Sequence, residues 1–485
     1  MSVSAELNRL PTSLYIAGQW RQATDASTFV VHDPATGDVI ADVADATPAD
    51  ALLALDAATA SAEDWSSTAP RARAEILLRA FELVNQHAAE IARLITLEMG
   101  KPLSESVAEV RYGGEFLRWF AEEAVRVGGR TGTTPEGTGT MIVTHRPVGP
   151  CYLITPWNFP LAMATRKIGP ALAAGCTAII KPAALTPLTT LYVVSLFEQA
   201  GVPAGVLNVI PTTRSAEVSD VLMRDVRLRK VSFTGSTGVG QTLLKQAADN
   251  VLRTSMELDG NAPFLVFDDG DLESAVDGAM VAKFRNVGQA CTAANRFLVQ
   301  TGIHDAFVER LAERVKALRV GPGLQEGVDI GPLIDKGAVR RVRGLVDDAI
   351  EHGAYEIVGG AGSDDDAYFP PTILTDVPTE SRLYREEIFG PVVSVTKFDT
   401  EDEAIELANG TEYGLASYAF TSDLGRANRL MASVNAGMLG VNAGAISNPA
   451  APFGGTKHSG MGREGGSEGI HEYLETKYAF LPSSG

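Results

Sequence analysis

The chain has 485 residues, of which 45% are hydrophobic, and its formal net charge at pH 7 is −19. Its length predicts two or three domains with large cores, and its negative charge argues against nucleic-acid binding and against attraction to anionic membranes. Three cysteines are too few for a disulfide framework. No apolar run reaches the roughly 18 residues of a membrane helix, and no export signal is visible. We therefore expect a cytoplasmic protein with a small-molecule substrate.

The N-terminal part is predicted to be helical after a strand-like opening at residues 13–21. Apolar residues recur every three or four positions over 71–102 and again over 105–127, and the first helical stretch ends at Gly100 and Pro102. Five glycines and a proline then interrupt the pattern within 128–140, before a short strand at 141–147. We expect this segment to form a protruding ribbon.

Short apolar strands alternate with helices from residue 150 to 267, and a second alternating series runs from about 271 to 445. Alternation of this kind is typical of parallel, doubly wound sheets. The sequence therefore predicts an α/β protein with two doubly wound domains, one for each of two ligands, and a small β element.

Cys291 differs from the other two cysteines. Cys151 and Cys176 lie in apolar runs and are interpreted as small buried hydrophobic residues, whereas Cys291 lies in the polar stretch NVGQACTAANRF. A nucleophilic thiol needs a route to the thiolate and a donor for the oxyanion that forms at a carbonyl. No histidine lies in a catalytic signature, and no spacing indicates a metal site. Taken alone, Cys291 is equally consistent with a structural role.

Three further stretches carry polar groups where predicted strands end. ITPWNFP (154–160) offers Asn158 as an amide donor to an oxyanion, and MELDG (256–260) offers Glu257 as a lone carboxylate. KVSFTGSTGVGQ (230–241) has the pattern of a strand, a glycine-rich turn and a helix start, which suits a phosphate. Its glycine spacing does not match the usual dinucleotide fingerprint.

Six motifs occur in one order along the chain: PWNFP, FTGSTGVG, MELxG, GQxC, EEIFGPV and PFGGxKxSGxGREG. Together they resemble the aldehyde dehydrogenase superfamily over nearly the whole chain, and the succinate-semialdehyde dehydrogenases within it most closely. The resemblance implies a cofactor domain (1–127 and 148–256), a catalytic domain (257–465) and a bridging element (128–147 and 466–485). Pairing of strands in that element between subunits would give a homodimer or homotetramer.

The resemblance also implies the roles of three catalytic residues. Cys291 is the nucleophile, and the side chain of Asn158 and the backbone amide of Cys291 hold the oxyanion. Glu257 is the general base for the water that hydrolyses the thioester. This chemistry needs no metal.

The implied cofactor is a nicotinamide dinucleotide. Lys181 would meet the adenosine ribose, Ser236 the pyrophosphate, and Glu387 and Phe389 the nicotinamide ribose and ring. Family members that prefer NAD often have a glutamate where this chain has Ala184, so we expect NADP to be preferred and NAD to be possible; the alternative is that Ala184 is a packing residue. The implied cofactor-binding residues are Thr155, Pro156, Trp157, Lys181, Ala184, Gly235, Ser236, Leu258, Glu387 and Phe389.

Two arginines and a serine indicate the substrate. Arg166 and Arg285 match the arginines that bind the substrate carboxylate in succinate-semialdehyde dehydrogenases, and Ser447 matches a substrate-contacting serine. An arginine fork can bind both carboxylate oxygens. The expected reaction is oxidation of succinate semialdehyde to succinate. The alternatives are a longer substrate such as glutarate semialdehyde, general aldehydes, a thioester or ester hydrolase without redox chemistry, and a non-catalytic protein.

The chain departs from the family pattern at two positions. Asp259 stands where the family normally has glycine, and it would disturb the site if it faced Glu257 or if the backbone there needed positive φ. Ala293 stands where some relatives have a second cysteine, so a local disulfide switch is not expected.

Overall fold

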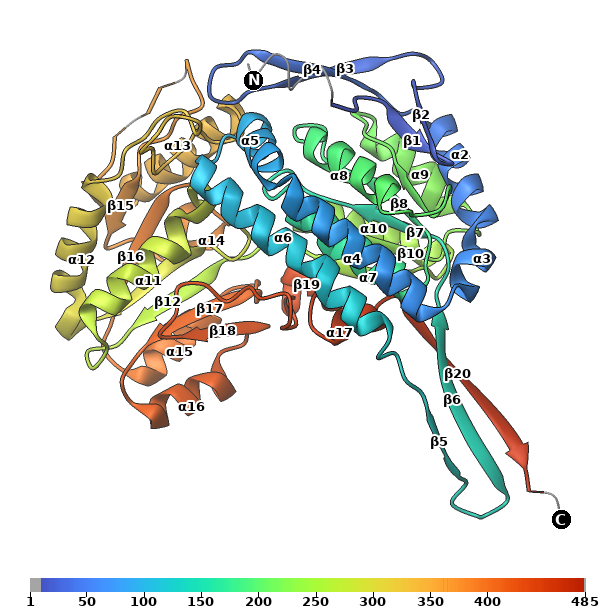
Figure 1. The fold of residues 1–485 in the computed structure, drawn as a ribbon. Helices are drawn as coiled ribbons and strands as arrows, with labels where there is room; N and C mark the ends of the chain where they lie inside the picture. The colour runs from blue at the N-terminus through green and yellow to red at the C-terminus, as the bar shows by residue number, and fades with distance from the viewer. Residues whose placement is uncertain (1–9, 361, 364, 484–485) are drawn as a thin grey trace.

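The computed structural model describes residues 10–360, 362–363 and 365–483. Two large sheets packed with helices meet near the middle of the molecule, and a long three-stranded arm projects from the body (Figure 1). The prediction of two doubly wound α/β units with a small β element is confirmed. In the described part of the chain, no helix has the length and apolar character needed to span a bilayer.

The first sheet has eight strands in the order β19-β11-β10-β7-β8-β9-β1-β2. Its five central strands are parallel, while β1 and β19 pair antiparallel with their neighbours. The strands are β1 (Leu14–Ile16), β2 (Gln19–Arg21), β7 (Cys151–Ile154), β8 (Ala178–Lys181), β9 (Leu207–Val209), β10 (Lys230–Thr234), β11 (Arg253–Glu257) and β19 (Gly460–Met461).

Helices cover both faces of this sheet. Successive strand residues point to opposite sides, and in a strand such as β7 all of them are buried, so each face needs its own layer of helices. Cys151 and Leu153 belong to the core beneath α4 to α8, whereas Tyr152 and Ile154 belong to the core beneath α2, α9 and α10. The helices are α2 (Pro48–Ala60), α3 (Ala62–Ser67), α4 (Pro70–Gln86), α5 (Ala88–Met99), α6 (Leu103–Ala124), α7 (Ala162–Ala174), α8 (Leu188–Gln199), α9 (Ser215–Arg224) and α10 (Thr237–Asp249). As the sequence predicts, α5 ends at Gly100, which is left-handed with φ 92°.

The second sheet has seven strands in the order β14-β15-β16-β13-β12-β17-β18, all parallel except the edge strand β14. The strands are β12 (Ala262–Val266), β13 (Ala294–Gln300), β14 (Tyr355–Val358), β15 (Thr372–Thr375), β16 (Val392–Phe398), β17 (Ala416–Phe420) and β18 (Met438–Val441). The accompanying helices are α11 (Leu272–Phe284), α12 (Thr301–Lys316), α13 (Lys336–Glu351), α14 (Arg382–Arg385), α15 (Glu401–Asn409) and α16 (Leu424–Ser433), with short 3₁₀ turns at Arg285–Gly288 and Lys457–Ser459.

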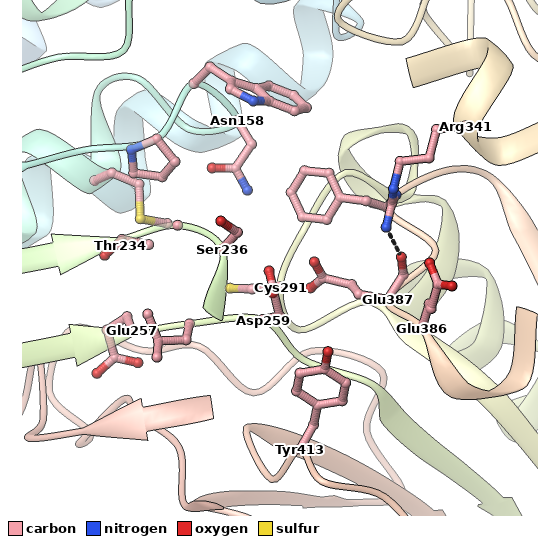
Figure 2. Close-up of a pocket in the computed structure, with 16 residues that line it drawn as sticks. Asn158, Thr234, Ser236, Glu257, Asp259, Cys291, Arg341, Glu386, Glu387 and Tyr413 are labelled. Carbon is pink, nitrogen blue, oxygen red and sulfur yellow. Dashed lines mark hydrogen bonds between the residues drawn. The ribbon is translucent and has the colours of Figure 1, made fainter. Parts of the chain in front are cut away.

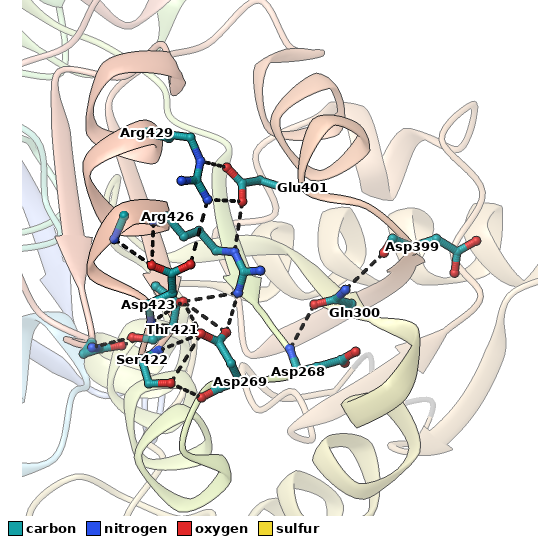
Figure 3. A network of polar contacts seen from close by, with 12 residues as sticks. Asp268, Asp269, Gln300, Asp399, Glu401, Thr421, Ser422, Asp423, Arg426 and Arg429 are labelled. Carbon is teal, nitrogen blue, oxygen red and sulfur yellow. Dashed lines mark hydrogen bonds and ion pairs between the residues drawn. The ribbon is translucent and has the colours of Figure 1, made fainter.

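A network of charged side chains joins the carboxyl ends of β12 and β17 to α15 and α16 (Figure 3). Asp269 accepts hydrogen bonds from the backbone amides of Ser422 and Asp423, at 3.2 and 2.9 Å. Arg426 forms ion pairs with both Asp269 and Glu401. These contacts lie at the carboxyl ends of strands in the second sheet. The amino ends of its strands lie at the opposite edge, which faces the first sheet.

The projecting arm is a sheet in the order β20-β6-β5, built from β5 (Arg130–Thr133), β6 (Gly139–Pro147) and β20 (Leu474–Pro482). β20 pairs antiparallel with β6 along its whole length, from Leu474 opposite Pro147 to Pro482 opposite Gly139. The predicted ribbon and the final strand therefore belong to one sheet of the same chain. A hairpin of β3 (Thr28–His32) and β4 (Val39–Ala44) and the short helix α17 (Glu468–His471) complete the fold.

Phe264 tests the core of the second sheet. It is fully buried, with ring centroids 4.9 Å from Phe297 and 5.0 Å from Phe420. Phe264→Ala is expected to lower the free energy of unfolding by about 3–5 kcal/mol, measured by chemical denaturation, because the cavity loses these contacts. The control Tyr355→Ala removes a ring that is 66% exposed and should change the free energy of unfolding by less than about 0.5 kcal/mol. Equal losses in the two variants would contradict this account.

Candidate active site

A pocket of about 540 Å³ lies where the two sheets meet (Figure 2). Its lining from the first sheet comes directly after three parallel strands: 156–158 after β7, 234–236 at the end of β10, and 257–259 at the end of β11. Its lining from the second sheet comes directly before three parallel strands: Cys291 before β13, Glu386, Glu387 and Phe389 before β16, and Tyr413 before β17. The pocket therefore faces the carboxyl ends of one sheet and the amino ends of the other.

The structure brings most of the residues singled out from the sequence into this pocket. Those that line it are Pro156, Trp157, Asn158, Gly235, Ser236, Glu257, Leu258, Cys291, Glu387 and Phe389. Asp259, singled out from the sequence as a departure from the family pattern, also lines it. Sequence reasoning did not assign the other lining residues to the site, which are Met163, Thr234, Arg341, Glu386 and Tyr413. Met163 lies on the helix that follows PWNFP, which could have indicated it. Arg341 and Tyr413 lie in stretches without any distinguishing pattern.

Cys291 is partly exposed to the pocket, whereas Cys151 and Cys176 are buried, as expected. The loop before Cys291 is strained, because Asn286 and Val287 have φ of 58° and 59° and a β-branched residue is disfavoured there. On its other side, a β carbon at Gly260 would lie 2.3 Å from the carbonyl oxygen of Cys291. Only glycine therefore allows the end of β11 to approach the nucleophile loop so closely.

Asn158 is held by a buried polar cluster. The ammonium of Lys101 and the side-chain amide of Asn286 donate to the backbone carbonyl oxygen of Asn158 at 2.8 and 3.0 Å. Lys101 is also ion-paired with Glu109 at 2.6 Å. The Asn158 side-chain amide donates to the carbonyl oxygen of Gln289 at 3.0 Å. Because an amide carries two N–H donors, one N–H remains to stabilise an oxyanion formed beside Cys291.

The charges around Cys291 oppose its ionisation in the resting protein. Burial, followed by the carboxyl of Glu387, raises the pKa of the thiol to about 12. Arg166 and Arg285 act in the opposite direction, and Glu257 adds to the rise. The thiol is consequently neutral at pH 7, and it needs a base or a change in the surrounding charge to become a nucleophile.

Glu257 is buried near the ion pair between Lys167 and Glu464. Neither of its carboxyl oxygens has a hydrogen-bond partner among the described residues. Burial and the neighbouring Glu464 raise its pKa well above the ordinary value. Glu464 is itself ion-paired with Lys167 at 2.5 Å. A carboxyl with a raised pKa holds a proton in the resting state, and once ionised it is a stronger base than an exposed glutamate.

The loop before β16 places Glu387 and Phe389 in the pocket. Phe389 has a left-handed backbone with φ 51°, and its ring meets Trp157 edge to face at a centroid distance of 5.4 Å. The guanidinium of Arg341 donates to the carbonyl oxygen of Glu387 at 2.5 Å (Figure 2) and to that of Ile388 at 2.9 Å. These two bonds hold the strained loop, and they give Arg341 a positioning role that the sequence did not indicate.

Asp259 does not behave as either expectation assumed. Its backbone is not left-handed, and its carboxylate faces away from Glu257, toward Glu387 (Figure 2). It accepts a hydrogen bond from the amide of Thr237, at the start of α10, at 2.8 Å. Neither condition for a disturbed site is therefore met, and the like-charge neighbour is Glu387.

The remaining predicted cofactor residues lie beyond the pocket. Thr155 is buried and its amide donates to the carbonyl oxygen of Lys181 at 3.2 Å. The ammonium of Lys181 donates to the hydroxyl of Ser215 at 3.2 Å, and burial lowers its pKa to about 8. Ala184 is half-buried in the turn that follows β8. Lys181 thus keeps a positive charge at pH 7 without a carboxylate partner in the described part of the chain.

The three predicted substrate residues lie outside the pocket lining. Arg166 is almost completely buried, is ion-paired with Glu464 at 3.4 Å and is hydrogen-bonded to the hydroxyl of Tyr112. Arg285 is half-buried, lies over the ring of Phe159 and has no ion-pair partner among the described residues. Ser447 is half-buried in the segment after β18. Of the two arginines, Arg285 is the one whose charge is not already neutralised.

Comparison with known proteins agrees with this geometry. A family model described as "Aldehyde dehydrogenase family" matches residues 20–479. A succinate-semialdehyde dehydrogenase of Paenarthrobacter nicotinovorans is 56% identical, over 91% of this chain and 98% of that protein. A 3-sulfolactaldehyde dehydrogenase and a glutarate-semialdehyde dehydrogenase of Pseudomonas putida are 48% and 46% identical, over 97% and 96% of both chains. The crystal structure of an NADP-dependent enzyme of Escherichia coli superposes with a TM-score of 0.96 at 44% identity, covering 98% of this chain and 99% of that one.

The pH dependence of alkylation tests the state of the thiol. Because burial raises the pKa of Cys291 to about 12, its reaction with iodoacetamide, without any added ligand, should accelerate about tenfold per pH unit from pH 7 to 9. Mass spectrometry of the Cys291 peptide measures the rate, and Cys291→Ala controls for labelling elsewhere. Arg285→Met should slow the reaction, because it removes a positive charge that favours the thiolate. A plateau below pH 8.5 would contradict the predicted pKa.

Proposed function

This chain belongs to the aldehyde dehydrogenase family, and we propose that it oxidises succinate semialdehyde to succinate with NADP as the preferred oxidant. The family acts on small-molecule aldehydes with NAD or NADP. The observation that carries the narrower proposal is the combination of a thiol, an amide donor and a buried carboxyl in one pocket, with Arg285 close to the thiol and without an ion-pair partner among the described residues.

The residues present fit a nicotinamide dinucleotide. The hydroxyl of Ser236 stands at the start of α10 without capping the helix, and Gly238, in the first turn of that helix, has open space where a side chain would lie. Such a helix start suits the pyrophosphate. Trp157 and Phe389 give the pocket aromatic walls near Cys291. Lys181 offers a cation for the adenosine end, and Ala184 brings no carboxylate that would repel a 2′-phosphate.

Three residues of this chain, Cys291, Asn158 and Glu257, would act in turn during oxidation of the aldehyde and hydrolysis of the thioester. Once the thiol of Cys291 has lost its proton to solvent, its sulfur attacks the aldehyde carbon, and the side-chain amide of Asn158 and the backbone amide of Cys291 stabilise the resulting oxyanion. The dinucleotide, when bound, supplies the acceptor for the hydride that this carbon loses. Glu257, once it has lost its own proton to solvent, takes a proton from the water that attacks the thioester. It then returns this proton to the departing sulfur, which releases the acid and restores the thiol. For this step, the Glu257 side chain has to turn from the Lys167–Glu464 pair toward the pocket.

Arg285 is proposed as the main anchor of the substrate carboxylate. A guanidinium stays charged and binds both oxygens of a carboxylate. Arg285 has no ion-pair partner among the described residues, although its charge acts on the buried carboxyl of Glu105. Arg166 would strengthen the anion site through its charge, or directly after leaving Glu464, and Ser447 would add a hydroxyl. This clamp fixes the charge of the substrate but not its length, and the relatives that act on glutarate semialdehyde and 3-sulfolactaldehyde define the alternatives to test.

The three-stranded arm is proposed to join subunits. β5 and β20 are the outer strands of a narrow sheet, and Tyr478, Phe480 and Leu481 on β20 are exposed. Edge strands with apolar side chains pair readily with another chain, so we propose that the protein is a homodimer or homotetramer.

Substrate preference tests the anion site. Initial rates with NADP should give a kcat/KM for succinate semialdehyde about 100-fold above that for butyraldehyde, which lacks the carboxylate, because a buried charge-assisted pair is worth about 3 kcal/mol. Glutarate semialdehyde and 3-sulfolactaldehyde measured alongside decide the length and the anion type.

Arg285→Ala should remove most of this preference and leave the butyraldehyde rate within about threefold, whereas Arg285→Lys should retain part of it. Equal rates with the charged and uncharged aldehydes in the parent protein would contradict the anion site. Turnover of a thioester without any reduction of dinucleotide would instead favour a hydrolase.

Ala184→Glu tests the cofactor preference. A glutamate there would place a carboxylate near Lys181, where it would repel a 2′-phosphate and accept bonds from ribose hydroxyls. The ratio of kcat/KM for NADP to that for NAD should fall at least about tenfold, with Ala184→Gln as the uncharged control. An unchanged ratio in both variants would assign Ala184 to packing.

A further inference from the structure

Asp259 occupies the helix start that the dinucleotide would use. Its carboxylate accepts from the amide of Thr237, the first residue of α10, at 2.8 Å. Ser236, the residue before it, provides no side-chain cap. Asp259 therefore caps the helix from the loop that follows β11, and it brings a negative charge into the pocket that also contains Cys291 and Glu387.

Glu387 faces the same carboxylate from the second sheet. The Glu387 carboxyl accepts from the amide of Gly260 at 3.0 Å, which places it beside the residue that follows Asp259. Its carboxyl points toward Asp259 across the pocket (Figure 2), and both side chains line that pocket. Because two ionised carboxyl groups that face each other repel, a proton on one of them lowers the free energy of the pair.

We propose that Asp259 and Glu387 form a carboxyl pair that shares one proton and releases it when the dinucleotide binds, so that Asp259 sets the strength and the pH dependence of cofactor binding. The proton passes to solvent. This inference rests on the proposed function, in which the Glu387 carboxylate accepts hydrogen bonds from the nicotinamide ribose. An ionised Glu387 is the better acceptor for these hydroxyls, and the shared proton has to leave before both of its oxygens can accept from them.

The ionisable groups around Asp259 and Glu387 favour a shared proton on this pair. Burial, then the charge of Asp259, raises the pKa of Glu387 well above its ordinary value, while the Gly260 amide and Arg341 act against the rise. Burial lowers the pKa of Lys283 to about 7, which weakens this nearby cation as a counter-charge. The other ionisable groups that face the pair are Cys291, Tyr413 and Glu386. With so few opposing charges, the pair retains its proton at neutral pH.

Calorimetric titration of NADP into the full-length protein, in two buffers of different ionisation enthalpy, measures the proton count directly. The parent protein should release up to one proton per site at pH 7, and its Kd should fall by up to tenfold per pH unit between pH 6 and 8. In Asp259→Asn, the amide can still accept from Thr237 and can donate to an ionised Glu387. This variant should bind NADP about tenfold more tightly at pH 7, with almost no proton release and little dependence on pH.

Glu386→Gln is the matched control, since it also removes one negative charge from the pocket lining but leaves the pair intact. Its proton release should equal that of the parent protein. Asp259→Gly is a second variant with the same expected change in proton release, and circular dichroism verifies that each variant is folded. Equal proton release and equal Kd in the parent protein and Asp259→Asn would overturn the carboxyl pair and leave the proposed function standing. Binding of neither NADP nor NAD by any of the proteins would overturn the proposed function and this inference with it.

Discussion

The close approach of two opposed sheet ends is the constraint on which the site depends. β11 of the first sheet passes into β12 of the second through only four residues, and Gly260 in that link lies against the carbonyl group of Cys291. Groups that end parallel strands in one sheet therefore meet groups that begin parallel strands in the other. The oxyanion donor Asn158, the carboxyl of Glu257 and the nucleophile reach one pocket because this link is short and contains glycine.

The same closeness creates an electrostatic problem. The pocket collects the carboxyl groups of Glu257, Glu387 and Asp259 around a thiol whose reaction needs a negative charge. Burial and Glu387 therefore keep the thiol neutral, and burial keeps protons on Glu257 and Glu387. In this account the resting site is protonated, and ligands change that state: a dinucleotide at Glu387 removes one proton, and the substrate anion is drawn to Arg285. A neutral resting thiol is also less open to oxidation than a thiolate.

The sequence predicted both sheets, the ribbon and most of the pocket lining, because strand–helix alternation and short motifs are local signals. PWNFP and TGSTG follow strands, and GQAC and EEIFG precede them, so these motifs identify their residues from the sequence alone. Long-range geometry could not be predicted in the same way. Arg341 and Tyr413 reach the pocket only through the packing of α13 and the loop before β17, Arg166 turned out to be paired with Glu464, almost 300 positions away, and Asp259 faces Glu387 rather than Glu257. Packing between the domains decides which charged side chains become neighbours, and no local sequence pattern predicts these pairs.

Trapping the acyl group tests the central claim that Cys291 carries the substrate between oxidation and hydrolysis. Glu257→Gln keeps the shape of a side chain that has no hydrogen-bond partner in the described structure but cannot act as a base. Mixing this variant with succinate semialdehyde and NADP, then quenching with acid, should give one equivalent of NADPH per site and a succinyl group on the Cys291 peptide, seen by mass spectrometry. Continued turnover without any adduct, or an adduct on another residue, would contradict the account.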